Sequence, residues 1–197
     1  MKPAAENVAH AAKKSVAEDA QQVLRAIELI ELGARMQVLE SELTLPRERM
    51  IRLYHELKGK APPRGLLPSS ADWYMTWLAN IHSSLFYNAY HFMRHDAGET
   101  RLDALTKAYR VYLEHCRTTG AEVPLDLTRA WTLVRFFGAD IVQMVPCSRC
   151  GGKFVAYKYD LCDGMVCGAC CPPPRAGKTS KRAAGPACNP CSPSAFV

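Results

Sequence analysis

The sequence lacks a long hydrophobic segment. No part of it reaches the roughly 18 uncharged apolar residues that a membrane-spanning helix needs. Its amino-terminal segment, MKPAAENVAHAAKKSVAEDAQQ, has no continuous apolar region of the kind found in secretory signals. We therefore expect a cytoplasmic protein without a membrane partner. Because thiols stay reduced in that compartment, closely spaced cysteines there indicate a metal site more often than a disulfide.

Common catalytic signatures are absent as well. The sequence contains no G-x-G-x-x-G, P-loop or G-x-S-x-G pattern. His91 and His95, in HFMRH, have the four-residue spacing of a zinc peptidase, but Phe92 occupies the position of the glutamate that would act as general base. We therefore predict that the protein is not an enzyme and has no small-molecule substrate.

Acidic residues are outnumbered by basic ones. The 197-residue chain has 25 Lys and Arg against 19 Asp and Glu, and its formal net charge is +6. A basic excess favours polyanionic partners such as nucleic acid. The chain is also 48% apolar and 22% charged, which is the composition of a folded globular protein with a hydrophobic core.

Periodic apolar residues predict helices over most of residues 16–143. The segments ARMQVLESEL and TLPRERMIRLYHEL predict a helix, a short turn and a second helix, and KGKAPPRGLLPSS then predicts a loop. The predicted buried stripes are Val16, Ala20, Val23, Ile27 and Ile30; Met50, Leu53, Tyr54 and Leu57; Trp73, Trp77, Ile81, Leu85 and Ala89; Leu102, Leu105, Tyr109 and Tyr112; and Leu127, Trp131, Val134 and Ile141.

Four cysteines are spaced like the ligands of a structural zinc module. They form two Cys-x2-Cys pairs separated by 16 residues, so each pair can make a tight turn and the connection lets the pairs face each other. Four thiolates at about 2.3 Å from zinc close its tetrahedral shell and leave no position for water or substrate. We therefore predict one structural Zn2+ per chain, bound by Cys147, Cys150, Cys167 and Cys170.

Additional cysteines leave alternatives to this ligand set. Cys162 lies in the connection and Cys171 adjoins Cys170, so either thiol is an alternative ligand. Cys188 and Cys191 form a third pair in a proline-rich segment with no partner pair nearby, and we interpret them as free thiols. A redox Cys-x2-Cys would require a βαβ context that the helical pattern does not offer.

Basic residues predict contacts with a polyanion. They cluster in and after the helix-turn-helix-like segment, and each phosphate that such a side chain neutralises releases counterions. A solvated helix face is the alternative interpretation, and charge alone does not separate the two. The candidate DNA contacts are Arg35, Arg47, Arg49, Arg52, Lys58, Lys60 and Arg64, with Lys153 in the cysteine module and Arg175 in the tail.

Together these patterns predict a mainly α fold in four parts. A flexible N-terminus over residues 1–15 precedes a multi-helix body over residues 16–145, which contains the helix-turn-helix-like segment and most of the candidate DNA contacts. A small four-cysteine, zinc-ribbon-like module with hairpins follows over residues 146–173, where Gly, Cys and β-favouring runs such as KFVAYKY replace the helical pattern. Residues 174–197 are rich in proline and without acids, which predicts a disordered basic tail.

A series of segments carries a resemblance to a known family. The segments are, in order, LGARMQVLESE, RMIRLYHELKGKAPPRGLLPSSADWYMTW, AYRVYLE, LTRAWTLVRF, CSRCGGKFV and PPPRA. They resemble the FlhC family, which supplies the larger subunit of the bacterial flagellar master activator. They extend from about residue 20 to residue 176, and so long an ordered series is more specific than any single motif. The zinc cysteines of the family fall on the four residues chosen above from their spacing.

The resemblance implies a DNA-binding transcriptional activator that assembles with FlhD in a hetero-oligomer, a heterohexamer. Such a complex would bind promoter DNA of flagellar operons and recruit RNA polymerase. We expect the helical body to contact FlhD, and the zinc module with nearby basic surfaces to contact DNA whose shape is read along with its sequence. Two alternatives remain: a zinc-ribbon interaction module that binds protein or RNA without operator specificity, and a thiol enzyme that uses a surplus cysteine.

Overall fold

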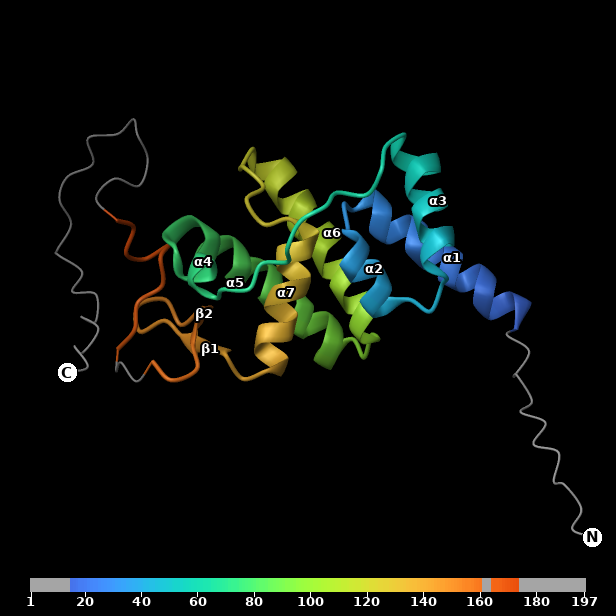
Figure 1. The fold of residues 1–197 in the computed structure, drawn as a ribbon. Coiled ribbons are helices and arrows are strands. Elements are labelled where there is room, and N and C mark those ends of the chain that lie inside the picture. Colours follow the sequence, from blue (N-terminus) through green and yellow to red (C-terminus); the bar gives the residue numbers. More distant parts are fainter. Residues whose placement is uncertain (1–14, 161–163, 174–197) are drawn as a thin grey trace, which may run out of the picture. The chain divides into compact units, whose positions relative to one another are not determined.

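The structure is a computed structural model that describes residues 15–160 and 164–173 (Figure 1). The chain divides into two compact units, one up to Arg64 and the other from Gly65 onward. The predicted flexible N-terminus, apart from residue 15, and the predicted tail with Arg175, Cys188 and Cys191 lie outside the described residues, as does Cys162. In the described part of the chain, no helix has the length and apolarity needed to cross a membrane.

Over its described residues, 15–64, the first unit contains three helices: α1 (Val16–Glu31), α2 (Met36–Glu42) and α3 (Arg47–Lys58). Helices α2 and α3 form the helix-turn-helix-like segment that the sequence predicts. The buried tyrosine of α3, Tyr54, donates a hydrogen bond of 3.1 Å to the carbonyl oxygen of Ala34, in the turn between α1 and α2. Gly59 ends α3 at a φ of +64°, a left-handed conformation that glycine adopts without steric cost.

The predicted buried stripe of α1 is wrong at its amino-terminal end. Val16 is 86% exposed and Ala20 is also exposed, whereas the fully buried residues are Ala26, Leu29 and Ile30 near the other end. The pattern is helical along all of α1, but only part of a helix that extends past its neighbours becomes buried. The amino-terminal part of α1 therefore presents apolar side chains to solvent.

The second unit contains the remaining elements. Its helices are α4 (Asp72–Met75), α5 (Trp77–His91), a turn of π-helix η1 (Phe92–Asp96), α6 (Arg101–Thr119) and α7 (Leu127–Gly138), and its strands are β1 (Val142–Pro146) and β2 (Lys153–Tyr157). Helix α5 contacts α6, α7 and β2 (Figure 1). The mainly α fold with a small sheet is therefore confirmed.

Two predicted stripes of this unit differ from the structure. The stripe of α6, from Leu102 to Tyr112, is buried as predicted. The stripe predicted for α5, which includes Trp77 and Ile81, is only half-buried. The face of α5 that is buried is a neighbouring one, and it contains polar residues such as Asn80. Ile141 is 40% exposed because α7 ends at Gly138, before the chain reaches it.

A two-stranded antiparallel sheet follows α7 directly. Val142 pairs with Tyr157 at one end and Pro146 with Lys153 at the other. The hairpin thus begins four residues before position 146, where the sequence places the start of the cysteine module. A two-stranded hairpin alone is marginally stable in water, so its outer edge needs support from the helices.

Polar side chains of α5 supply that support along β2. Asn80 donates through Nδ2 to the carbonyl oxygen of Val155 at 2.7 Å, and the backbone N–H of Val155 donates to Oγ of Ser84 at 3.0 Å. Asn88 donates to the carbonyl oxygen of Lys153 at 3.0 Å. These three residues are spaced four apart and therefore lie on one side of the helix, where they satisfy backbone groups that a third strand would otherwise pair.

Candidate metal centre and candidate DNA contacts

The four predicted cysteines lie together in the second unit. Their sulfur atoms are all within 4.8 Å of one another, and the sulfurs of Cys150 and Cys167 are 3.8 Å apart. Tetrahedral zinc with Zn–S bonds of about 2.3 Å places its sulfurs about 3.8 Å from one another. The donor set and its spacing therefore fit a metal of the zinc type. Cys171 adjoins this group but its sulfur is not one of the four clustered atoms.

Backbone hydrogen bonds shape the first cysteine pair into a tight turn. The N–H of Gly151 donates to the carbonyl oxygen of Cys147 at 2.8 Å, and the N–H of Cys147 donates to the carbonyl oxygen of Gly152 at 2.9 Å. Gly151 has a φ of +71°, which a residue with a side chain rarely adopts. The pair therefore forms the loop that closes the β1–β2 hairpin.

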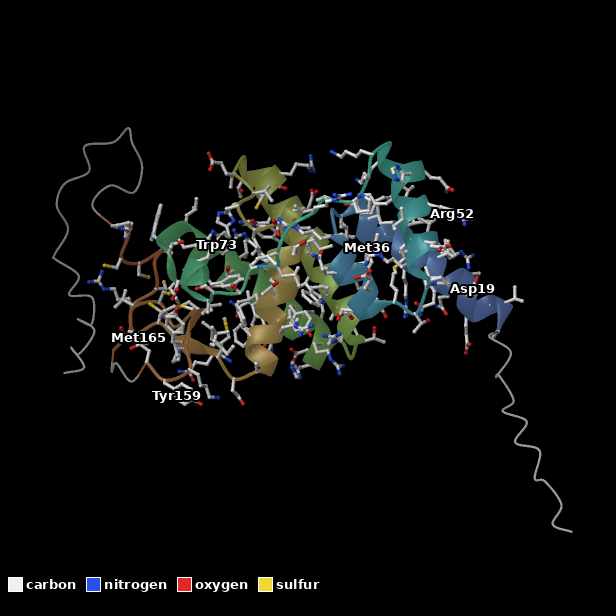
Figure 2. The ribbon with its side chains drawn as sticks, viewed as in Figure 1. Asp19, Met36, Arg52, Trp73, Tyr159 and Met165 are labelled. Carbon is white, nitrogen blue, oxygen red and sulfur yellow. The ribbon has the colours of Figure 1, made fainter. Side chains whose placement is uncertain are left out.

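The second pair is fastened to the first by main-chain contacts. The N–H of Ser148 donates to the carbonyl oxygen of Met165 at 2.9 Å, and Met165 lies beside the hairpin (Figure 2). The N–H of Cys170 then donates to the carbonyl oxygen of Cys167 at 3.1 Å, which turns the chain between the two thiols. Both pairs are thus brought to one place by the backbone.

The electrostatics of the cluster favour a bound cation. Burial opposes ionisation of the Cys147 thiol, but N–H donors from Cys167, Cys150 and Arg149 stabilise the thiolate and lower the pKa of Cys147 to about 6. Hydrogen bonds with Cys150 and Cys167, followed by burial, raise the pKa of Cys170 to about 12. The two shifts favour one thiolate, at Cys147, beside a protonated thiol at Cys170; a divalent cation would displace the remaining protons and hold all four sulfurs as thiolates.

Trp77 attaches the cysteine module to α5. Its indole Nε1 donates a 2.8 Å hydrogen bond to the carbonyl oxygen of Gly168, which lies inside the second cysteine pair. A Cβ atom at Gly168 would lie 2.9 Å from Cδ1 of Trp77 and 3.4 Å from Cγ1 of Ile81. The sequence pattern placed Trp77 and Ile81 on a buried stripe but gave no indication that the cysteine module would be their neighbour.

The structure distributes the candidate DNA contacts over both units. Arg47, Arg49 and Arg52 are exposed on α3, and Arg52 is seen there in Figure 2. Arg47 forms an ion pair with Glu40, and Arg49 pairs with Asp19 at 2.6 Å. Among the described residues Arg52 forms no ion pair, so its guanidinium is the exposed charge of α3 that is most available to a phosphate.

The other candidate DNA contacts differ in exposure and in their hydrogen bonds. Arg35 is half-buried at the start of α2, and Lys58 donates through Nζ to the carbonyl oxygen of Glu31 at 3.2 Å. Lys60 and Arg64 are exposed after α3. In the second unit Lys153 is exposed at the start of β2. The charge pattern did not single out Arg149, which donates to the carbonyl oxygen of Cys170 at 3.2 Å, although its position inside Cys-x2-Cys was a visible signal.

The structure thus places the chain among mainly α proteins that carry a small zinc-ribbon-like module with four cysteines. A family model described as flagellar transcriptional activator (FlhC) matches residues 11–183. The chain therefore belongs to the FlhC family, as its segments indicated.

Three relatives show how far the similarity extends, and each is named flagellar transcriptional regulator FlhC. The relative from Paraburkholderia phymatum is 70% identical over 172 residues, which cover 87% of this chain and 78% of the relative. The relative from Thauera aminoaromatica is 53% identical over 169 residues, covering 86% and 87%. The relative from Proteus mirabilis is 49% identical over 176 residues, covering 89% and 91%. These names describe regulators of transcription and indicate no catalytic function.

We predict that Gly168→Ala destabilises the second unit. The added Cβ would force the Trp77 ring to move and lose its hydrogen bond to residue 168, at a cost of about 1–3 kcal/mol in the free energy of unfolding. Urea unfolding followed by tryptophan fluorescence measures this change. Gly138→Ala is the matched control, because a Cβ there meets no atom within 4 Å. Equal stability of the two variants would contradict the predicted packing constraint.

Proposed function

We propose that the chain is one subunit of a DNA-binding transcriptional activator that assembles with FlhD, as a heterohexamer, and switches on flagellar operons. Membership in the FlhC family is the observation that carries the proposal, because the similarity covers most of the chain. A flagellar transcriptional regulator must act on promoter DNA and on the transcription machinery. We also propose that the complex recruits RNA polymerase and that the protein is cytoplasmic.

The exposed apolar part of α1 supports assembly with a protein partner. Val16 is 86% exposed and Leu24 is 66% exposed on that helix. Apolar side chains in such a position gain free energy when a partner removes them from water. We propose that residues 16–145, which include this helix, provide the FlhD contacts and part of the DNA contacts, while residues 146–173 form the metal module.

Zinc is proposed to act structurally in that module. Cys147, Cys150, Cys167 and Cys170 would hold the ion, whose chemistry is to neutralise the thiolates and to cross-link the two cysteine pairs. A shell closed by four thiolates has no position for a substrate. Arg149 and Lys153 are exposed and extend basic charge onto the module, whose surface a bound ion would stabilise.

We predict that Cys147→Ser abolishes stoichiometric zinc binding. Removing one of four thiolates from so small a module forfeits much of a binding free energy on the order of 10 kcal/mol, so the variant should also lose solubility or thermal stability. Metal content after purification under reducing conditions measures the loss. Cys171→Ser is the matched control and should retain zinc. If Cys147→Ser keeps one zinc per chain, or if Cys171→Ser loses it, the ligand set is different.

We predict that the chain and FlhD together protect a defined site upstream of flagellar operons from nuclease. The measurement is a footprint with the co-purified complex, repeated across salt concentrations because phosphate contacts weaken as salt increases. Neither subunit alone should give the same protection. Absence of protection at every salt concentration would favour the alternative function, a zinc-ribbon module that binds protein or RNA without operator specificity.

We further predict that Arg52→Ala weakens operator binding by the complex about threefold to tenfold. Loss of one phosphate contact should also reduce the slope of log affinity against log salt by about 1. Arg117→Ala is a suitable control, because Arg117 is exposed, pairs with Glu114 and was not a candidate contact. An unchanged affinity and salt slope for Arg52→Ala would remove this residue from the DNA interface.

A further inference from the structure

The second unit contains a pocket that the proposed function does not use. Its volume is about 540 Å³, and it lies between α5, η1, α6 and α7. Pockets that bind small organic ligands commonly have volumes of about 300–1,000 Å³. Besides the imidazole of His95, its functional groups are aromatic rings and guanidinium groups: Tyr87, Tyr90, Phe137, Arg94, Arg101 and Arg135.

The guanidinium groups make one side of the pocket strongly basic. Arg94 comes from η1, Arg101 is the first residue of α6, and Arg135 lies in the last turn of α7. Arg94 donates to the carbonyl oxygen of Glu99 at 2.8 Å, and the guanidinium of Arg135 lies 4.6 Å from the ring centroid of Trp131. Among the described residues, neither Arg94 nor Arg135 forms an ion pair, and no acidic residue lines the pocket.

Two nearby carboxylates have partners of their own. Glu99 pairs with Lys107 at 2.5 Å, and Asp103 accepts a hydrogen bond of 2.6 Å from the hydroxyl of Thr100. The last carbonyl groups of α7 also have donors, since the N–H of Ala139 bonds to the Arg135 carbonyl at 2.9 Å and the N–H of Ile141 bonds to the Phe136 carbonyl at 3.0 Å. Three arginines at one site therefore favour an anion, above all a phosphate, which guanidinium groups bind in bidentate geometry.

The aromatic side of the pocket is made of three rings, two of which stack on each other. The rings of Tyr87 and Phe137 are stacked, with centroids 3.4 Å apart and planes inclined by 11°, and the Tyr90 ring lies 5.6 Å from that of Tyr87. Burial, followed by the proximity of Tyr90, raises the pKa of Tyr87 to about 12. Its phenol is therefore uncharged near neutral pH, and the surface suits a planar ring of the ligand.

The backbone at the edge of the pocket is unusual in a way that supports a binding role. Residues Phe92–Asp96 form a turn of π-helix directly after α5. Such turns are rare and occur frequently at functional sites, because the wider turn changes the direction of the side chains that follow. Here the turn contributes two lining residues, Arg94 and His95.

We infer that this pocket binds a nucleoside phosphate, with the phosphate held by the arginines of η1, α6 and α7 and the base lying against the aromatic wall. The ligand is bound and not converted, so the inference is compatible with a protein that has no small-molecule substrate. The pocket would be a site for a regulatory ligand within the helical body. The site is distinct from the proposed DNA contacts, because none of its lining residues is one of them.

The test is isothermal titration calorimetry on the full chain purified together with FlhD. AMP and GMP are the probes, and adenosine and inorganic phosphate separate the contributions of base and phosphate. We expect at least one nucleotide to bind with a dissociation constant in the micromolar range, and both adenosine and inorganic phosphate to bind at least about tenfold more weakly. An Arg94→Gln/Arg135→Gln double variant should weaken nucleotide binding by at least about tenfold.

Arg110→Gln is the matched control. Arg110 is exposed on α6 but does not line the pocket, so its loss should leave nucleotide affinity unchanged. Circular dichroism checks that the variants fold, which is expected because the replaced side chains are exposed. The inference is overturned if neither nucleotide binds at about 1 mM, if inorganic phosphate binds as well as the nucleotides, or if the control weakens binding equally.

A DNA phosphate is the alternative source of the same anionic group. Adding a saturating operator duplex to the titration distinguishes the two sources. Nucleotide binding that persists beside bound operator supports a separate ligand site. Competition by the duplex, together with an equal loss of operator affinity in the double variant, would show that the pocket is a DNA contact and would overturn the inference. If the unmodified complex binds nucleotide but no operator, the proposed function fails and the inference stands.

Discussion

The hydrogen bonds between α5 and Val155 are the interaction on which the second unit depends. Strand β2 has one neighbour in the sheet, β1, so its outer edge would expose backbone groups. Asn80 and Ser84 satisfy the carbonyl and the N–H of Val155, which is itself buried. Asn80 also donates to the carbonyl oxygen of Tyr74 at 2.9 Å. One side-chain amide therefore joins α4, α5 and the hairpin, and polar residues at the centre of α5 are a structural requirement.

The arrangement of the cysteines follows from the position of that hairpin. The first pair lies in the loop that β1 and β2 close, so its place is determined by the strand register. The second pair lies beyond both strands and is held by Ser148 and Trp77 through backbone carbonyl groups. Each such bond contributes only about 0.5–1.5 kcal/mol. A metal that cross-links the two pairs contributes far more, so the hairpin orients the module and the metal would hold it closed.

Local patterns in the sequence predicted the cysteine cluster and part of the core, but not the contacts between distant segments. Cysteine spacing predicted a cluster because two tight turns can be recognised from four residues. The α6 stripe was correct because one face of that helix is buried from Leu102 to Cys116. The predicted burial of Val16 was wrong because periodicity identifies a helix but does not show where the neighbouring helices end. The bond between Asn80 and Val155 joins residues 75 positions apart, and a lone asparagine in a helical pattern gives no signal of such a partner. The π-helical turn and the pocket beside it were likewise invisible.

The ion pairs of Arg47 and Arg49 on α3 do not prevent these side chains from binding a phosphate, but breaking them adds a small free-energy cost. The side chains of Arg47 and Arg49 are 65% and 45% exposed in their pairs with Glu40 and Asp19. Exposed pairs of this kind contribute about 0–1 kcal/mol each, because water and salt screen them. A phosphate in a duplex offers a comparable attraction together with counterion release. Arg52 has no such pair to give up within the described part of the chain, so the three arginines of α3 should differ in how strongly each responds to DNA, with Arg52 the strongest.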